Sequence, residues 1–218
     1  ATVINEIPYG HIRRAANGDE EPMQSWVDAT GIVRQRHKPY GLSLLNDGKY
    51  SYDAQGADIG LTVLRSPIYA HHLPAEPEPE EQYAYIDQGI QRFTYTLLPH
   101  LGSWKEAGTA RRAAELNQPL TALATTFHPQ GTLPQVNSFL QVEAENVIVN
   151  VLKKSEDGEG WVLRAYETDK CQTETMIHLL FLGRTIQVHF EPCEIKTFYI
   201  PEQSALPVRE TNLLEWLG

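Results

Sequence analysis

Two alternating segments on either side of an Asp47-Gly48 turn constrain this chain more than any other feature. Before the turn, Leu42 and Leu44 alternate with their neighbours, and the run LTVLR that follows Gly60 alternates again. Side chains of a strand point to opposite faces with a period of two, so both segments are predicted to be strands. The polar loop between them resembles loops that present ligand-contacting groups, although a long solvated turn fits the same pattern equally well.

Short strands are predicted along most of the remaining chain. Phe93, Tyr95 and Leu97 alternate with polar residues and form the clearest amphipathic strand. Between residues 147 and 200, apolar runs are separated by turns at the short, even spacing that is typical of a β-sandwich. A last strand is expected at 212–217. These patterns predict an all-β chain.

One short helix interrupts the β pattern. Ser103 and Glu106 fit a capping box, in which each side chain accepts a hydrogen bond from the other residue's backbone N–H. The alanine-rich sequence that follows predicts a helix from about Lys105 to Asn117, which Pro119 would stop. The next residues contain prolines and glycine without a sustained period, so they are predicted to connect two units.

Composition excludes several classes of partner. The formal net charge of -10 argues against a nucleic-acid backbone or an anionic membrane surface, because like charges repel. No apolar run approaches the roughly 20 residues that a membrane-spanning helix needs. No signal peptide is visible, and the chain starts without Met directly in strand-like sequence, as we expect of a fragment of a longer protein.

The two cysteines, Cys171 and Cys193, lie far apart and outside any CxxC spacing. A disulfide between them is one alternative, but two buried thiols in a reducing compartment is the interpretation that we favour. No Asn begins a glycosylation sequon, which agrees with that choice. We therefore expect a cytoplasmic protein.

Complete catalytic machinery is not visible in the sequence. The chain has no G-x-S-x-G elbow, no P-loop, no G-x-G-x-x-G and no H-E-x-x-H. A retaining glycosidase needs only two carboxyl groups about 5 Å apart, but sequence spacing cannot place loop carboxylates at that distance. The available loop carboxylates are Asp47, Asp53, Asp58 and Asp87.

The histidines do not predict a metal site. His71 and His72 are adjacent, and neighbouring side chains of an extended chain point in opposite directions. His178 and His189 fall on predicted strands, where a hydrogen-bonded structural histidine is the more common case. We therefore assign no metal ligand.

Several segments resemble the C-terminal part of the α-mannosidases of glycoside hydrolase family 38, with the cytosolic and bacterial enzymes as the closest subgroup. The resemblance covers nearly the whole chain in matching order. Its main segments are YGLSLLNDGKYSYDAQGADIGLTVLRSP (40–67), YIDQGIQRFTYTLLPHLGSW (85–104), AAELNQPL (113–120), EAENVIVNVLKKSEDGEGWVLRAYE (143–167), CEIKTFYI (193–200) and ETNLLEWL (210–217).

The resemblance implies a fold and its division into domains. It implies an all-β chain that begins within a partial mutarotase-like supersandwich carrying one short helix and ends in a small β-sandwich. The expected parts are the latter part of the large β-sandwich at 1–120, a connection at 121–137 and the small terminal β-sandwich at 138–218.

The resemblance also implies where the chemistry lies. Whole members of the family are retaining glycosidases that hydrolyse α-mannosidic bonds with an Asp nucleophile, a carboxylic general acid and a Zn²⁺ bound by His and Asp. Those residues belong to an N-terminal catalytic domain that this chain lacks, so we assign no catalytic residue and no cofactor here. We expect the chain alone to be inactive, with its own catalytic domain and mannose-containing saccharides as partners.

Within this framework, the polar loop and two nearby residues are candidates for the wall of the substrate cleft. Sugars are bound by amide, carboxylate and guanidinium groups, which these residues supply. The alternative is that Arg65 and Asp87 form a structural ion pair between strands. The candidate residues are Asn46, Asp47, Lys49, Tyr50, Asp53, Arg65 and Asp87.

Two functions of other classes stay open. A carbohydrate-binding module would present aromatic side chains on a flat exposed face, and Tyr50, Tyr52 and Trp104 are candidates for this role. A purely structural domain would instead form homo-oligomers through exposed apolar surface.

Overall fold

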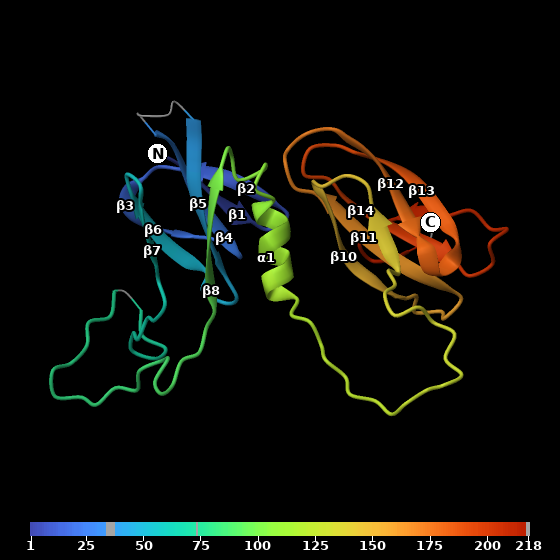
Figure 1. The fold of residues 1–218 in the computed structure, drawn as a ribbon. Helices are drawn as coiled ribbons and strands as arrows, with labels where there is room; N and C mark the ends of the chain where they lie inside the picture. The colour runs from blue at the N-terminus through green and yellow to red at the C-terminus, as the bar shows by residue number, and fades with distance from the viewer. Residues whose placement is uncertain (34–37, 73, 217–218) are drawn as a thin grey trace.

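The computed structural model describes residues 1–33, 38–72 and 74–216, and it is almost entirely antiparallel β-structure (Figure 1). In this described part, the first half of the chain forms a five-stranded sheet of order β2-β1-β4-β5-β8 and a three-stranded sheet of order β3-β6-β7. The strands are β1 (Thr2–Ile7), β2 (Gly10–Arg14), β3 (Asn17–Pro22), β4 (Trp26–Val33), β5 (Lys38–Asn46), β6 (Ser51–Gln55), β7 (Asp58–Leu61) and β8 (Tyr95–Leu101).

The three-stranded sheet packs against one face of the five-stranded sheet. Their shared core contains Val3, Val27 and Leu44 from one sheet and Tyr52 from the other. The Tyr52 hydroxyl donates a 3.0 Å hydrogen bond to the side-chain oxygen of Asn5, which is also fully buried. Burial of these alternating apolar residues is what fixes the register of the strands, because a slip of one residue would expose them.

The single α-helix of the described residues, α1 (Thr109–Asn117), covers the opposite face of the five-stranded sheet. Trp26, Leu45, Trp104 and Ala113 form the core there, and the rings of the two tryptophans lie 4.7 Å apart. The predicted capping box forms, since the Ser103 N–H donates to Glu106 at 2.7 Å. The box closes the turn before the helix, so the helix starts four residues later than Lys105.

The second half of the chain forms a separate small β-sandwich (Figure 1). Its sheets have the orders β10-β11-β14-β15 and β13-β12-β9. One apolar cluster fills the space between them, with Leu163, Ile177, Phe190 and Ile200 fully buried. The elements are β9 (Leu140–Val142), β10 (Val147–Lys154), β11 (Gly160–Glu167), β12 (Thr173–Leu179), the short 3-10 helix η1 (Leu180–Leu182), β13 (Arg184–Phe190), β14 (Ile195–Pro201) and β15 (Arg209–Thr211).

The β1–β2 hairpin contacts this sandwich. The Tyr9 ring meets the Tyr166 ring edge-on at 5.1 Å, and Lys170 donates to the His11 carbonyl at 2.5 Å. The loop before α1 and the helix itself reach the same unit, because Lys105 donates to the Asp169 carbonyl and Arg111 donates to the Glu145 carbonyl. Side chains of one unit thus bind backbone carbonyls of the other.

Three sequence-based expectations about elements are wrong. The segment predicted as a loop between the first two strands contains β6, which pairs with β3 and β7. The strand predicted to follow Gly60 ends at Leu61, because the chain leaves the sheet there for a long excursion. Residues 212–216 form turns beyond β15 and not a last strand, and residues 217–218 lie outside the described residues.

Candidate functional site

The candidate turn between β5 and β6 is built on the side chain of Asn46. Asn46 is fully buried, and its side-chain oxygen accepts hydrogen bonds from the N–H groups of Gly48 (3.0 Å) and Lys49 (2.7 Å). Its amide donates to the Gln24 carbonyl at 3.0 Å. Such an Asx-type arrangement replaces the backbone bonds of a regular strand with side-chain bonds. Asn46 therefore shapes the turn and does not present polar groups to solvent.

Asp47 ties this turn to the start of β8. Its N–H donates to the Thr94 carbonyl at 3.2 Å, and its carboxylate accepts the Thr94 N–H at 2.7 Å. That backbone hydrogen bond is the main reason why the pKa of Asp47 lies below its usual range. Asp47 is exposed and stays ionised, so a negative charge is fixed at the rim of the turn.

An exposed aromatic pair lies beside the turn. Phe93 and Tyr95 stack with ring centroids 6.4 Å apart, and the Lys49 ammonium lies 5.4 Å from the centre of the Phe93 ring. Both rings are exposed, and Tyr50 is 63% exposed. Together the turn and this pair offer a carboxylate, an ammonium group and flat aromatic faces. The alternation of Phe93 and Tyr95 indicated a strand, but the pairing of β5 with β8, with Tyr95 opposite Asn46, and of Asp47 with Thr94 is what brings them to the turn.

The other candidate residues lie farther along the chain. Asp53 is exposed on β6, where its carboxylate lies over Gly60 of β7. Arg65 and Asp87 lie on the two arms of the excursion between β7 and β8, which an isolated bridge between Ile68 and Tyr85 closes. Both are exposed. The structure thus gathers Asp47, Lys49 and Tyr50 in one turn and leaves these three residues outside it.

The ion pair considered for Arg65 has a different partner. Among the described residues, the Arg65 guanidinium pairs with Glu20 at 4.0 Å and not with Asp87. Both members of that pair are largely exposed, and Glu20 also accepts hydrogen bonds from the hydroxyls of Ser51 and Thr62. The bond is a surface contact of small energetic value.

Helix α1 holds the turn through side-chain hydrogen bonds to β5. Asn117, the last residue of the helix, donates to the Asn46 carbonyl at 3.0 Å. At the other end of the helix, the Thr109 hydroxyl lies 2.8 Å from the Ser43 hydroxyl in a fully buried contact. Two side-chain bonds therefore fasten α1 along β5 and end at the turn. The sequence offered no signal for Asn117, because its partner lies 71 positions away.

Two of the aromatic residues proposed for a carbohydrate-binding face are buried. Tyr52 is 1% exposed within the core between the two sheets, and Trp104 is 3% exposed beneath α1. Those two predictions are wrong, because Tyr52 lies on the buried face of β6 and Trp104 packs in the core with Trp26 and Ala113. Tyr50 is the member of that set that faces solvent.

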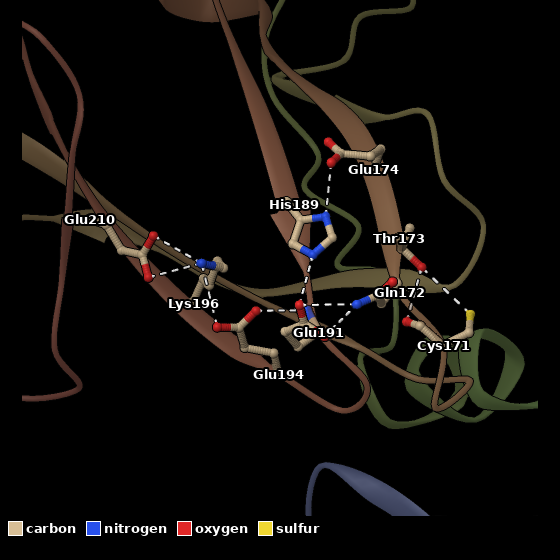
Figure 2. A network of polar contacts seen from close by, with 9 residues as sticks. All are labelled: Cys171, Gln172, Thr173, Glu174, His189, Glu191, Glu194, Lys196 and Glu210. Carbon is tan, nitrogen blue, oxygen red and sulfur yellow. Dashed lines mark hydrogen bonds and ion pairs between the residues drawn. The ribbon is translucent and has the colours of Figure 1, made fainter.

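The terminal sandwich carries a charged network on its exposed face (Figure 2). His189 lies between two carboxylates, with Glu174 at 2.8 Å from Nδ1 and Glu191 at 3.1 Å from Nε2. The hydrogen bonds to Glu191 and Glu174 raise the pKa of His189 above its usual value. Figure 2 also shows Lys196, on β14 of the other sheet, between the carboxylates of Glu194 and Glu210.

The geometry of these histidines supports a structural role. His178 likewise bonds to Thr185 and Glu143, both at 3.0 Å, so the prediction of hydrogen-bonded structural histidines is confirmed. Within residues 1–33, 38–72 and 74–216, no group of three or more His, Cys, Asp or Glu side chains could hold a metal ion. The family resemblance places the zinc in the N-terminal catalytic domain and not in this chain.

A buried carboxylate organises the end of the sandwich that faces the first unit. Glu167 accepts hydrogen bonds from the N–H groups of Asp169 (2.6 Å) and Cys193 (2.9 Å). Burial raises the pKa of Glu167, but these N–H donors outweigh burial, so the pKa is lowered overall. Both thiols are free. Cys193 is partly buried, whereas Cys171 is exposed, contrary to the expectation of two buried thiols.

The fold and the turn place this chain among proteins built from two β units. The described residues form two β units, one α-helix and a polar and aromatic turn, and no described helix is long and apolar enough to cross a membrane. Two family models match it. Residues 2–80 match the glycosyl hydrolases family 38 C-terminal domain, and residues 146–198 match the glycosyl hydrolases family 38 C-terminal beta sandwich domain.

Individual relatives agree with the family models. The chain is 32% identical over 171 residues to α-mannosidase G of Dictyostelium discoideum, covering 75% of this chain and 14% of the relative. It is 30% identical over 185 residues to human α-mannosidase 2C1, covering 80% of this chain and 16% of the relative. The chain thus spans about one sixth of the length of these relatives, and it belongs to glycoside hydrolase family 38 as a C-terminal region of its α-mannosidases.

Solved structures show the same fold. The crystal structure of an α-mannosidase from Enterococcus faecalis V583 superposes with a TM-score of 0.70 at 17% identity, over 91% of this chain and 24% of the other. A second structure, of a family 38 glycosyl hydrolase protein from Enterococcus faecalis, gives a TM-score of 0.69 at 18% identity. The likeness covers both units, so their order along the chain is shared with these proteins.

Proposed function

We propose that this chain is the non-catalytic C-terminal β region of a cytoplasmic, retaining α-mannosidase that hydrolyses terminal α-mannosidic bonds. The observation that carries the proposal is that two family 38 C-terminal domain models match this one chain, at residues 2–80 and 146–198. In this role the region packs on a zinc-dependent catalytic domain and forms part of the wall of its cleft. In this proposal the zinc and the nucleophile belong to that domain, as the family resemblance implies.

The turn between β5 and β6 is the part of the region that we assign to the cleft wall. Its charged and aromatic groups suit a sugar, because hydroxyls bind carboxylate and ammonium groups while the apolar face of the ring stacks on aromatic side chains. Asp47, Lys49 and Tyr50 would face the saccharide. Asn46 would act by holding the turn, and Asp53, Arg65 and Asp87 would line the rim or order the catalytic loops.

Kinetics of the larger enzyme test this assignment. Asp53→Ala should lower kcat/KM for a mannoside by roughly 10-fold or more if the carboxylate binds a hydroxyl, which is the effect of losing one hydrogen bond to a charged group. Asp58→Ala, an exposed carboxylate on the neighbouring strand, is the matched control. Wild-type kcat/KM and stability for Asp47→Ala and Lys49→Ala would remove the turn from the cleft, and the same result for Asp53→Ala would remove Asp53 from the rim.

The exposed aromatic pair favours a second candidate function. Stacked, solvent-facing rings such as Phe93 and Tyr95 are typical of carbohydrate-binding surfaces, so the chain alone would bind mannosides without cleaving them. Titration of mannosides into the isolated chain decides between the two. Saturable binding that is lost in Phe93→Ala would favour a binding module, whereas hydrolysis by the isolated chain would contradict both candidates.

A further inference from the structure

The connection between the two units has an unusual composition. Residues 118–139 contain no Asp, Glu, Lys or Arg, although charged residues make up 21% of the chain. Exposed linkers are usually rich in charged residues, because a chain with few apolar groups and many charges stays hydrated. Here leucines, a valine and phenylalanines recur between neutral polar residues. Depletion of charged residues is typical of the core of a protein interface.

The structure leaves these apolar side chains in solvent. Their exposed fractions lie between 85% and 102% for Leu120, Leu123, Phe127, Leu133 and Val136. The segment forms no helix or strand in the described structure, and its internal hydrogen bonds join near neighbours such as Thr125 and His128. At its last residue, the Phe139 carbonyl accepts the Leu180 N–H of the terminal unit at 3.0 Å. Loops of this length without secondary structure are uncommon in compact domains unless they have a function or are disordered.

The segment also runs on a particular side of the molecule. It leaves the lower end of α1 and passes below the terminal unit in the view of Figure 1 before it enters β9. The excursion between β7 and β8 also extends downward in this view, below the first unit. Tyr69, Tyr85 and Ile90 are exposed on it. Exposed apolar surface that gathers on one side of a molecule marks a site of protein interaction.

We propose that residues 118–139 are a docking segment, which lies extended on an apolar, uncharged surface of the catalytic portion of the same α-mannosidase. This proposal rests on the proposed function and names the surface through which the region binds its partner domain. The matched α-mannosidase structure extends well beyond the part that this chain covers. In an enzyme of that length, the catalytic portion would present a large surface that is covalently joined to this region. A second copy is a poorer partner, because two chains of net charge -10 repel each other.

Hydrogen exchange provides the direct test. Backbone amides of residues 120–137 should exchange at least about 10-fold more slowly in the larger enzyme than in the isolated 218-residue chain, because docking protects amides that are otherwise free. Equal rates in the two proteins would overturn the proposal. Protection in the isolated chain that grows with protein concentration would also overturn it, because a second copy would then be the partner.

A matched pair of substitutions completes the test. Leu123→Asp places a charge in the segment, and in the larger enzyme it should restore fast exchange across residues 120–137 and lower the unfolding temperature. Leu214→Asp makes the same change at a leucine that is 68% exposed on the terminal unit, and it should change neither quantity. Identical behaviour of the two variants would contradict a docking role for the segment.

The two proposals fail in different ways. If the segment stays unprotected while the turn variants lose kcat/KM, only the docking segment is refuted. If the segment is protected while the isolated chain hydrolyses a mannoside, the proposed non-catalytic role is refuted and the interface stands.

Discussion

Replacement of Asn46 by alanine separates a structural role from a sugar-binding role at the turn. The side chain makes three backbone hydrogen bonds, to the Gln24 carbonyl and to the N–H groups of Gly48 and Lys49, at 2.7 to 3.0 Å. Each is worth about 1 kcal/mol net, and a buried partner left without a bond costs more than an exposed one. Gly48 is exposed and regains water, so the free energy of unfolding should fall by about 2–3 kcal/mol.

Denaturation of the isolated chain measures this loss. Trp26 and Trp104 are buried in the first unit, so their fluorescence reports on the unit that contains the turn. The urea midpoint should fall, and the unfolding temperature should drop by roughly 5–10 °C for a chain of this size. Asn46→Asp keeps the acceptor for Gly48 and Lys49 but loses the donor to Gln24. Its urea midpoint should therefore lie between those of Asn46→Ala and the wild type.

Asp47→Ala is the control in the same turn. Its carboxylate is exposed and accepts a single backbone hydrogen bond, so the midpoint should stay close to that of the wild type. An Asn46→Ala variant that unfolds at the wild-type urea concentration would refute the reasoning, because the turn would then be held by something other than this amide.

Two further predictions concern the terminal unit and its contact with the first unit. Glu167→Gln replaces one of the two acceptor oxygens with an NH₂ donor that faces backbone N–H groups. It should therefore destabilise the terminal sandwich by about 3 kcal/mol in urea, and a wild-type midpoint would contradict it. Burial and the Lys170 charge lower the pKa of His11, so its contribution to stability is complete above pH 6.5 and is lost as pH falls below it. The raised pKa of His189 gives the opposite sign, since its contribution is complete below pH 6.5 and is lost at higher pH. Imidazole shifts in an NMR titration check both, and titration of the two histidines at the same pH would contradict the two assignments.

The candidate site was only partly accessible to sequence reasoning. The pattern around the Asp47-Gly48 turn predicted a polar loop, and in the structure Asp47 and Tyr50 of the turn are exposed while Lys49 is half-buried. The pattern gave no reason to separate Asn46 from Asp47, although one is buried and the other exposed. The contributions of Phe93 and Asn117 were missed, because each reaches the turn through a contact between distant parts of the chain. The division into domains at 1–120, 121–137 and 138–218 stays a prediction.

The sequence by itself determined the all-β character of the chain, the single helix and most strands of the terminal sandwich. Those features depend on alternation, turn residues and capping, which act over a few neighbouring positions. Tertiary structure decided that Tyr52 and Trp104 are core residues, that β6 exists and that Arg65 pairs with Glu20. Which face of a strand is buried depends on the sheet or helix that packs against it, and local sequence does not contain that information.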